Sequence, residues 1–170
     1  LTNVNLTQIS TTNSGVTLNP LDGSVNVLPG TPSGNYIVTY QICEKLNPTN
    51  CDQAIVTVNV NNANIDAVND NGNPVLTGVG GQSFPNVLIN DTLNGNPATL
   101  SNVILTQINT TNAGVTLNTT DGSINVTANT LGGSYVVTYQ ICEVLNPTNC
   151  DTATVTVFVE SPSIKITKDG

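Results

Sequence analysis

The stretch YIVTYQICEKLNPTNCDQAIVTVNV, Tyr36–Val60, decides the fold of this chain. In Tyr36–Cys43 and again in Ala54–Val60, every second residue is an apolar or aromatic one. β-branched residues are frequent in both segments. Alternation with a period of two is typical of half-buried β-strands. We therefore predict two antiparallel strands, joined by the short loop that Cys43 and Cys51 enclose.

The same stretch returns 99 positions later as YVVTYQICEVLNPTNCDTATVTVFV, Tyr135–Val159. Moving the sequence by 99 aligns residues 1–60 with residues 100–159, and 42 of these 60 positions are identical. A period near 100 residues is longer than the roughly 20–45 residues of a solenoid repeat. The repeat therefore predicts a string of separately folded domains.

The second copy has the pattern of an all-β domain. Helical spacing does not persist for ten residues, and Asp121-Gly122 is a turn signal between two strands. About seven short strands in one copy favour an immunoglobulin-like β-sandwich, so we predict tandem immunoglobulin-like β-sandwich repeats. The expected strands of the second copy are residues 74–78, 84–89, 102–109, 114–118, 122–127, 134–142 and 152–159.

The repeat also predicts domain boundaries. Residues 63–160 are expected to form a complete repeat, and residues 1–62 a partial repeat without its N-terminal strands, because residues 64–99 have no counterpart before Leu1. The tail 161–170 matches nothing in the first copy and is expected to be a linker or the start of another domain. In the rival arrangement, residues 73–90 pair with strands of the first copy instead.

The composition excludes several classes of partner. Only 8% of the residues are charged, the net charge is −8, and the chain has 27 Asn and 26 Thr. It has no Arg or His, and Lys occurs only at positions 45, 165 and 168. Phosphate groups require clustered cations, so we expect no nucleic-acid partner and no anionic membrane surface. No run of eighteen apolar residues occurs, so we also expect no membrane insertion.

The four cysteines allow a metal loop, a redox pair or a structural disulfide. Zinc requires cysteines or histidines close together, and redox pairs usually have a two-residue spacer. Facing residues at the end of an antiparallel hairpin lie within disulfide reach. We therefore predict the disulfides Cys43–Cys51 and Cys142–Cys150, which are typical of an oxidising, extracytoplasmic compartment.

Residues suited to catalysis are scarce. The chain has no His, and Lys45 is replaced by Val in the second copy. Asp22 and Asp121 lie in predicted turns, and Glu44 and Glu143 follow a cysteine of each pair. General acid–base or nucleophilic chemistry requires a group with a tuned pKa. We therefore expect that the protein is not an enzyme.

One acidic segment, IDAVNDNGNP at residues 65–74, could hold a cation. Asp66, Asn69 and Asp70 are hard oxygen ligands of the kind that calcium prefers, and Asp91 could add another. The segment resembles the cadherin linker motif D-x-N-D-N, with one extra residue after Asp66. The alternative is a solvated turn in an Asn-rich chain, and no other cofactor is expected.

The order of motifs AVND, NVLINDTLNG, GVTLNTTDGSINV and YVVTYQICEVLNPTNCDTATVTVFV resembles repeats of very large cell-surface adhesins of Bacteroidota. It is most similar to the mobile adhesins of flavobacterial gliding motility (the SprB type), and also to bacterial cadherin-like and Ig-like repeats. The resemblance covers residues 64–159 fully and residues 1–60 as a partial copy. It implies type IX secretion, a location at the cell surface, and a part in surface adhesion and gliding.

The same resemblance implies two glycosylation sites. Asp91-Thr92-Leu93 and Asp151-Thr152-Ala153 are similar to the D-(S/T)-apolar sequence that this phylum uses for O-glycosylation. The predicted acceptors are Thr92 and Thr152. The equivalent segment of the first copy, Asp52-Gln53-Ala54, departs from the pattern.

These observations favour a structural stalk or fibre segment of an extracellular adhesin. Its expected partners are neighbouring repeats of the same chain and, through the full-length protein, a substratum or surface polysaccharide. The alternative is a carbohydrate- or protein-binding Ig-like module, which would present an exposed aromatic platform or polar cluster on its loops. The four tyrosines instead occupy the expected inward face of a strand: Tyr36, Tyr40, Tyr135 and Tyr139.

Overall fold

The computed structural model describes residues 1–163, and residues 164–170 lie outside the described part. The chain divides into two compact units, Leu1–Asn62 (unit 1) and Ala63–Gly170 (unit 2). Both are built from β-strands, and the fold is all-β. Most of the predicted further unit at 161–170 falls on the residues that are not described.

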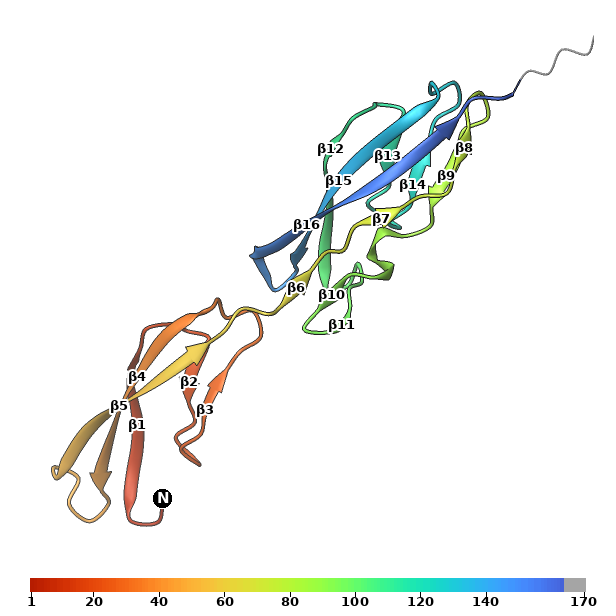
Figure 1. Cartoon of the computed structure of the whole chain (residues 1–170). Coiled ribbons are helices and arrows are strands. Elements are labelled where there is room, and N and C mark those ends of the chain that lie inside the picture. Colours follow the sequence, from red (N-terminus) through yellow and green to blue (C-terminus); the bar gives the residue numbers. More distant parts are fainter. Residues whose placement is uncertain (164–170) are drawn as a thin grey trace, which may run out of the picture. The chain divides into compact units, whose positions relative to one another are not determined.

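Unit 1 contains five strands in two sheets (Figure 1). The larger sheet has the order β1-β4-β5, and β2 pairs with β3 in the smaller one. The strands are β1 (Val4–Thr11), β2 (Val16–Leu18), β3 (Val25–Val27), β4 (Gly34–Glu44) and β5 (Cys51–Val60).

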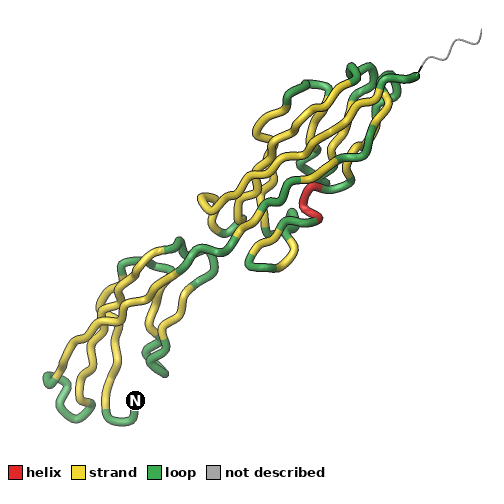
Figure 2. Tube along the Cα trace, in the orientation of Figure 1, coloured by secondary structure: helices red, strands yellow, loops and turns green. Residues whose placement is uncertain are grey.

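Unit 2 repeats this arrangement and adds the segment from β6 to β11 ahead of it (Figure 2). The added elements are β6 (Ile65–Asp66), β7 (Asp70–Asn71), β8 (Val75–Leu76), β9 (Gly81–Phe84), the 3-10 helix η1 (Val87–Ile89), β10 (Thr92–Leu93) and β11 (Asn96–Pro97). The repeated elements are β12 (Val103–Thr110), β13 (Val115–Leu117), β14 (Ile124–Val126), β15 (Gly133–Glu143) and β16 (Asn146–Glu160).

The sheets of unit 2 form a sandwich. One sheet has the order β12-β15-β16-β7, with β8 also on β16, and the opposing sheet has the order β13-β14-β9. A third small sheet joins β11, β10 and β6. The residues between the sheets form one apolar core, whose largest fully buried side chains include Tyr139, Ile124 and Ile141. This is the predicted sandwich class.

The long hairpin of each unit follows from the alternating pattern in its sequence. In β15 the side chains of Val137, Tyr139 and Ile141 are buried, whereas the residues between them are only partly buried. β15 pairs with β16 in an antiparallel register that runs from Gly133 opposite Val159 to Cys142 opposite Cys150. Period-two alternation therefore directs every second residue of this hairpin into the core.

The connection between β13 and β14 is fixed by polar side chains. Gly122 has φ of 78°, which favours glycine, and its amide donates to the carbonyl of Asn118. The carboxylate of Asp121 accepts from the backbone amide of Ser123 at 2.8 Å. A hydrogen bond from the side chain of Ser123 and the bond from its amide lower the pKa of Asp121, and the same two bonds from Ser24 lower the pKa of Asp22. Both aspartates thus have a local role in a turn.

The strand expected at residues 84–89 is wrong beyond Phe84. Pro85 supplies no backbone donor, and the side chain of Asn86 accepts from Leu88 N and caps η1. The short strands β6, β7, β10 and β11 were also not expected, since two-residue strands carry too little alternation to be recognised. Among residues 1–163, no helix is long and apolar enough to cross a membrane.

Candidate functional site

A disulfide closes the end of the long hairpin in each unit. Cys43 is bonded to Cys51 and Cys142 to Cys150, which are the predicted pairs, and the Cα atoms are 4.1 Å apart in both. The two residues of each pair face each other across the antiparallel ladder. The register of the strands therefore places the sulfur atoms within bonding distance, and both cross-links are local to one unit.

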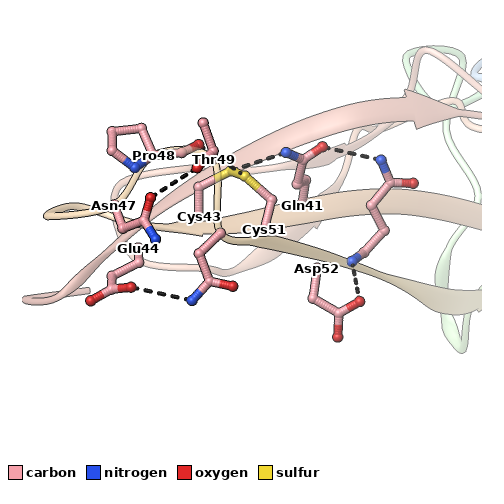
Figure 3. The surroundings of a disulfide bond; sticks show 10 residues. Gln41, Cys43, Glu44, Asn47, Pro48, Thr49, Cys51 and Asp52 are labelled. Carbon is pink, nitrogen blue, oxygen red and sulfur yellow. Dashed lines mark hydrogen bonds between the residues drawn. A yellow bond between two sulfur atoms is a disulfide. The ribbon is translucent and has the colours of Figure 1, made fainter.

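Polar side chains order the loop that each disulfide encloses (Figure 3). Asn50 Nδ2 donates to Glu44 Oε2 at 3.2 Å, and Thr49 Oγ1 donates to Asn47 Oδ1 at 2.8 Å. The second loop repeats both bonds at the same distances, from Asn149 to Glu143 and from Thr148 to Asn146. Glu44 and Glu143 thus each accept a hydrogen bond within the loop that the disulfide encloses.

The second feature is a buried acidic pair in unit 2, formed by Asp70 of β7 and Asp91 of the short connection between η1 and β10. Only 6% of Asp70 and 1% of Asp91 is exposed. Asp91 Oδ1 accepts from Val68 N at 2.7 Å, and the Tyr139 hydroxyl lies 3.1 Å from each Asp91 carboxylate oxygen. Asp70 Oδ2 is buried without a hydrogen-bond partner.

The oxygen atoms around the acidic pair outnumber the hydrogen-bond donors that the protein supplies to them. The Tyr139 hydroxyl carries one proton, yet it also lies 3.1 Å from Val68 O and 3.3 Å from Val87 O. Burial raises the pKa of Asp70 to about 6, and the charge of Asp91 adds to the shift. Burial also raises the pKa of Asp91, with smaller contributions from the charges of Asp66 and Asp151.

The structure does not bring the four predicted calcium ligands together as a set. Asn69 Oδ1 is used by Thr154, whose amide and hydroxyl donate to it at 2.8 and 3.0 Å. Asp91 is held by Val68 and Tyr139, and Asp66 is exposed. Within residues 1–163, no group of three or more acidic, His or Cys side chains has the arrangement of a metal site. Calcium binding at these residues stays a prediction.

The two predicted glycosylation sites differ in exposure. Thr152 lies on β16 and is exposed, whereas Thr92 is half-buried in β10 and the preceding Asp91 is buried. Thr92 lies between Asp66 and Pro97 in the small sheet. If either site is modified in the folded protein, Thr152 is the accessible one, and glycosylation of both stays a prediction.

Sequence reasoning missed what the hydroxyl of Tyr139 does and what Asp151 holds. Asp151 Oδ2 accepts from Ala67 N at 2.8 Å and so fixes the start of the added segment to β16. The only signal was that Asp52 and Asp151 occupy the same place in both copies. Of the four tyrosines, Tyr139 is fully buried, whereas Tyr36, Tyr40 and Tyr135 are half-buried.

Four shallow hollows are among those on the surface of the described residues. One has a volume of about 390 Å³ and is lined by Thr2, Asn3, Glu44, Lys45 and Leu46. The others have volumes of 180 to 240 Å³. None of the four is lined by an aromatic side chain, which a carbohydrate platform would need.

Comparison with known proteins gives structural neighbours only. No protein-family profile matches the chain, and no curated protein matches it. A fragment of mouse cadherin-23 (domains EC22–24) matches with a TM-score of 0.44 and 12% identity over 94% of this chain. The extracellular cadherin domains 3–6 of protocadherin gamma B2 give the same three values, and human protocadherin-24 EC1–2 gives a TM-score of 0.38. The chain spans 53% of the cadherin-23 fragment and 44% of the protocadherin gamma B2 fragment.

Proposed function

We propose that this chain is a structural stalk segment of an extracellular adhesin, which carries load and supplies length. The observation that supports this role most strongly is the pairing of the two terminal segments of unit 2. β7 and β8, near the start of the unit, pair in parallel with β16 at its end. Tension applied at the two ends of the unit therefore pulls these strands past each other in shear.

Shear is the geometry in which hydrogen bonds between strands share a load. Gly72 N donates to Thr156 O and Thr77 N donates to Glu160 O, both at 2.9 Å. Asn69 Oδ1 accepts two further hydrogen bonds from Thr154, and Asp151 Oδ2 accepts one from Ala67 N. These bonds must stretch together when the ends separate, so unit 2 is built to resist extension along its own strands. We call this set of contacts the terminal clamp.

The remaining features suit a stalk outside the cytoplasm. The disulfides keep each hairpin closed under load and are typical of an oxidising compartment. The many Asn and Thr residues can be solvated through uncharged amide and hydroxyl groups, so the chain needs few charged side chains for solubility. The resemblance to flavobacterial gliding adhesins supports a place on the cell surface, with neighbouring repeats as direct partners and a substratum contacted through the full-length protein.

A binding assay separates this role from that of a carbohydrate- or protein-binding module. The 170-residue chain is applied to a glycan array and to polysaccharide-coated surfaces, beside a variant in which the hollow at Lys45 is altered by Lys45→Ala. The stalk role predicts no signal above that of an unrelated β-sandwich. Saturable binding that the variant loses would make the chain a recognition module instead.

A further inference from the structure

Unit 1 leaves open a face that unit 2 buries. Ile42 is 39% exposed, whereas its counterpart Ile141 is 0% exposed. Val27 is 42% exposed, and its counterpart Val126 is 4% exposed. The residues are the same in each pair, so the difference arises from what covers them and not from the strands themselves.

The same difference extends over much of the inner surface of unit 1, although Val16, Leu18 and Val38 are buried there as their counterparts are in unit 2. Side chains that are fully buried in unit 2 have half-buried counterparts here, and the counterpart of buried Ala153 is exposed. Of these residues only Val25 differs from its counterpart, which is Ile124. We call this surface the open face; besides Ile42 and Val27 it includes Leu6, Val25, Tyr40, Ala54, Val56 and Val58.

Unit 2 shows which kind of chain fits this face. Its added segment, residues 63–99, contributes Val75, Val87, Leu88 and Ala98 to the core. The segment pairs with β16 through β7 and β8, and with β14 through β9. It therefore fills the space between two sheets by adding a strand to the edge of each.

Unit 1 retains the features that receive this segment. Among the strands described, β5 pairs only with β4 and β3 only with β2, so each has one unpaired edge beside the open face. Asp52 corresponds to Asp151, and Tyr40 corresponds to the Tyr139 that contacts Asp91. Unpaired edges and exposed apolar surface favour the addition of a strand.

We propose that the open face of unit 1 is a docking surface for a polypeptide segment of the same pattern as residues 63–99. A second open face is a poorer occupant, because a flat apolar surface cannot supply hydrogen bonds to the edges of β3 and β5 together. This inference is independent of the load-bearing role of the chain.

The register of the docked segment follows from unit 2. The counterparts of Asp70 and Asn71 pair with Val56 and Thr57, as they do with Val155 and Thr156. The counterpart of Phe84 lies opposite Val25, and the counterpart of Asp91 contacts the Tyr40 hydroxyl. Docking therefore completes the core of unit 1 and gives it a terminal clamp.

A fusion tests the proposal. A copy of residues 63–99 is placed ahead of Leu1 of the 170-residue chain, and amide hydrogen exchange is measured in β3 and β5. We expect exchange of the Val56–Val60 amides to slow at least tenfold in the fusion, toward the rates of Val155–Val159. The matched control carries Val87→Asp and Leu88→Asp in the added copy only, and should leave these rates unchanged.

Two results would overturn the proposal. One is unchanged exchange in the fusion, or an equal slowing in the control. The other is a parent chain that sediments as a dimer with its β5 amides already protected, which would make a second copy the occupant. If the fusion aggregates, the peptide 63–99 is added to the parent chain: saturable protection of Val56–Val60 supports docking, and no protection at millimolar peptide contradicts it.

Discussion

Tyr139 illustrates how the segments packed against a residue determine its role. Its hydroxyl reaches Asp91 at 3.1 Å in unit 2, whereas Tyr40, on the same strand position of unit 1, is half-buried. A buried carboxylate that loses its donor keeps the full cost of its desolvation. The two tyrosines therefore form a matched pair for mutation.

Tyr139→Phe should lower the free energy of unfolding of unit 2 by about 1–3 kcal/mol, because Asp91 loses a buried donor. Tyr40→Phe should change that of unit 1 by less than about 0.5 kcal/mol, since this hydroxyl is not part of such a network. Chemical denaturation of both variants measures the difference. Equal effects at the two positions would show that the contact with Asp91 adds no stability.

The acidic pair also predicts a dependence on pH. The pKa of Asp70 is about 6 in the folded protein, above its ordinary value of 3.8, so the folded state binds this proton more tightly than the unfolded chain. The resulting stabilisation is complete below pH 3.8 and is lost as the pH rises through about 6. Unit 2 should therefore melt at a higher temperature at pH 5 than at pH 7.5.

Asp70→Asn should raise the melting temperature of unit 2 at pH 7.5 and remove most of its change between pH 5 and 7.5. Scanning calorimetry in the presence of a chelator measures both effects. Calcium provides the control, since a cation bound between Asp70 and Asp91 would stabilise the ionised pair. Stabilisation by calcium at pH 7.5 that Asp70→Asn abolishes would contradict a purely proton-linked pair.

At the scale of the element, the hairpin contains most of what could be predicted. Alternation in Tyr36–Val60 was sufficient to predict the strands, their register and the facing cysteines, because one face of each strand must be buried. The short strands β6, β7, β10 and β11 could not be predicted, since two residues show no period. The acidic pair could not be predicted either, because Asp70, Asp91 and Tyr139 meet only through tertiary packing.

The disulfide of each hairpin should stabilise its unit by restricting the unfolded chain. Closing a loop of nine residues is worth about 2.5 kcal/mol in the chain-entropy estimate. We expect Cys142→Ser with Cys150→Ser to lower the free energy of unfolding of unit 2 by about that amount and to leave unit 1 unchanged. Denaturation of the double variant beside the parent chain, both without reductant, measures it. A loss that appears equally in unit 1 would mean that the two units do not unfold independently.

At the scale of the whole molecule, the two units share the same hairpin, and unit 2 also contains the segment from β6 to β11. Unit 2 contains its terminal clamp, because β7 and β8 lie on β16. In unit 1, the corresponding edge of β5 has no partner among the described strands. The proposed load-bearing role therefore assigns a different mechanical strength to each unit within one chain.

Single-molecule extension of the 170-residue chain, held at both ends, tests the load-bearing role most directly. We predict two unfolding steps, with unit 2 requiring the larger force, and a Gly72→Pro variant that lowers this force because Thr156 loses its donor. Reduction should lengthen each unfolded unit by about 20–25 Å, the span of the loop that the disulfide encloses. Unfolding of unit 2 at a force no larger than that of unit 1, unaffected by Gly72→Pro, would contradict a stalk built to carry load.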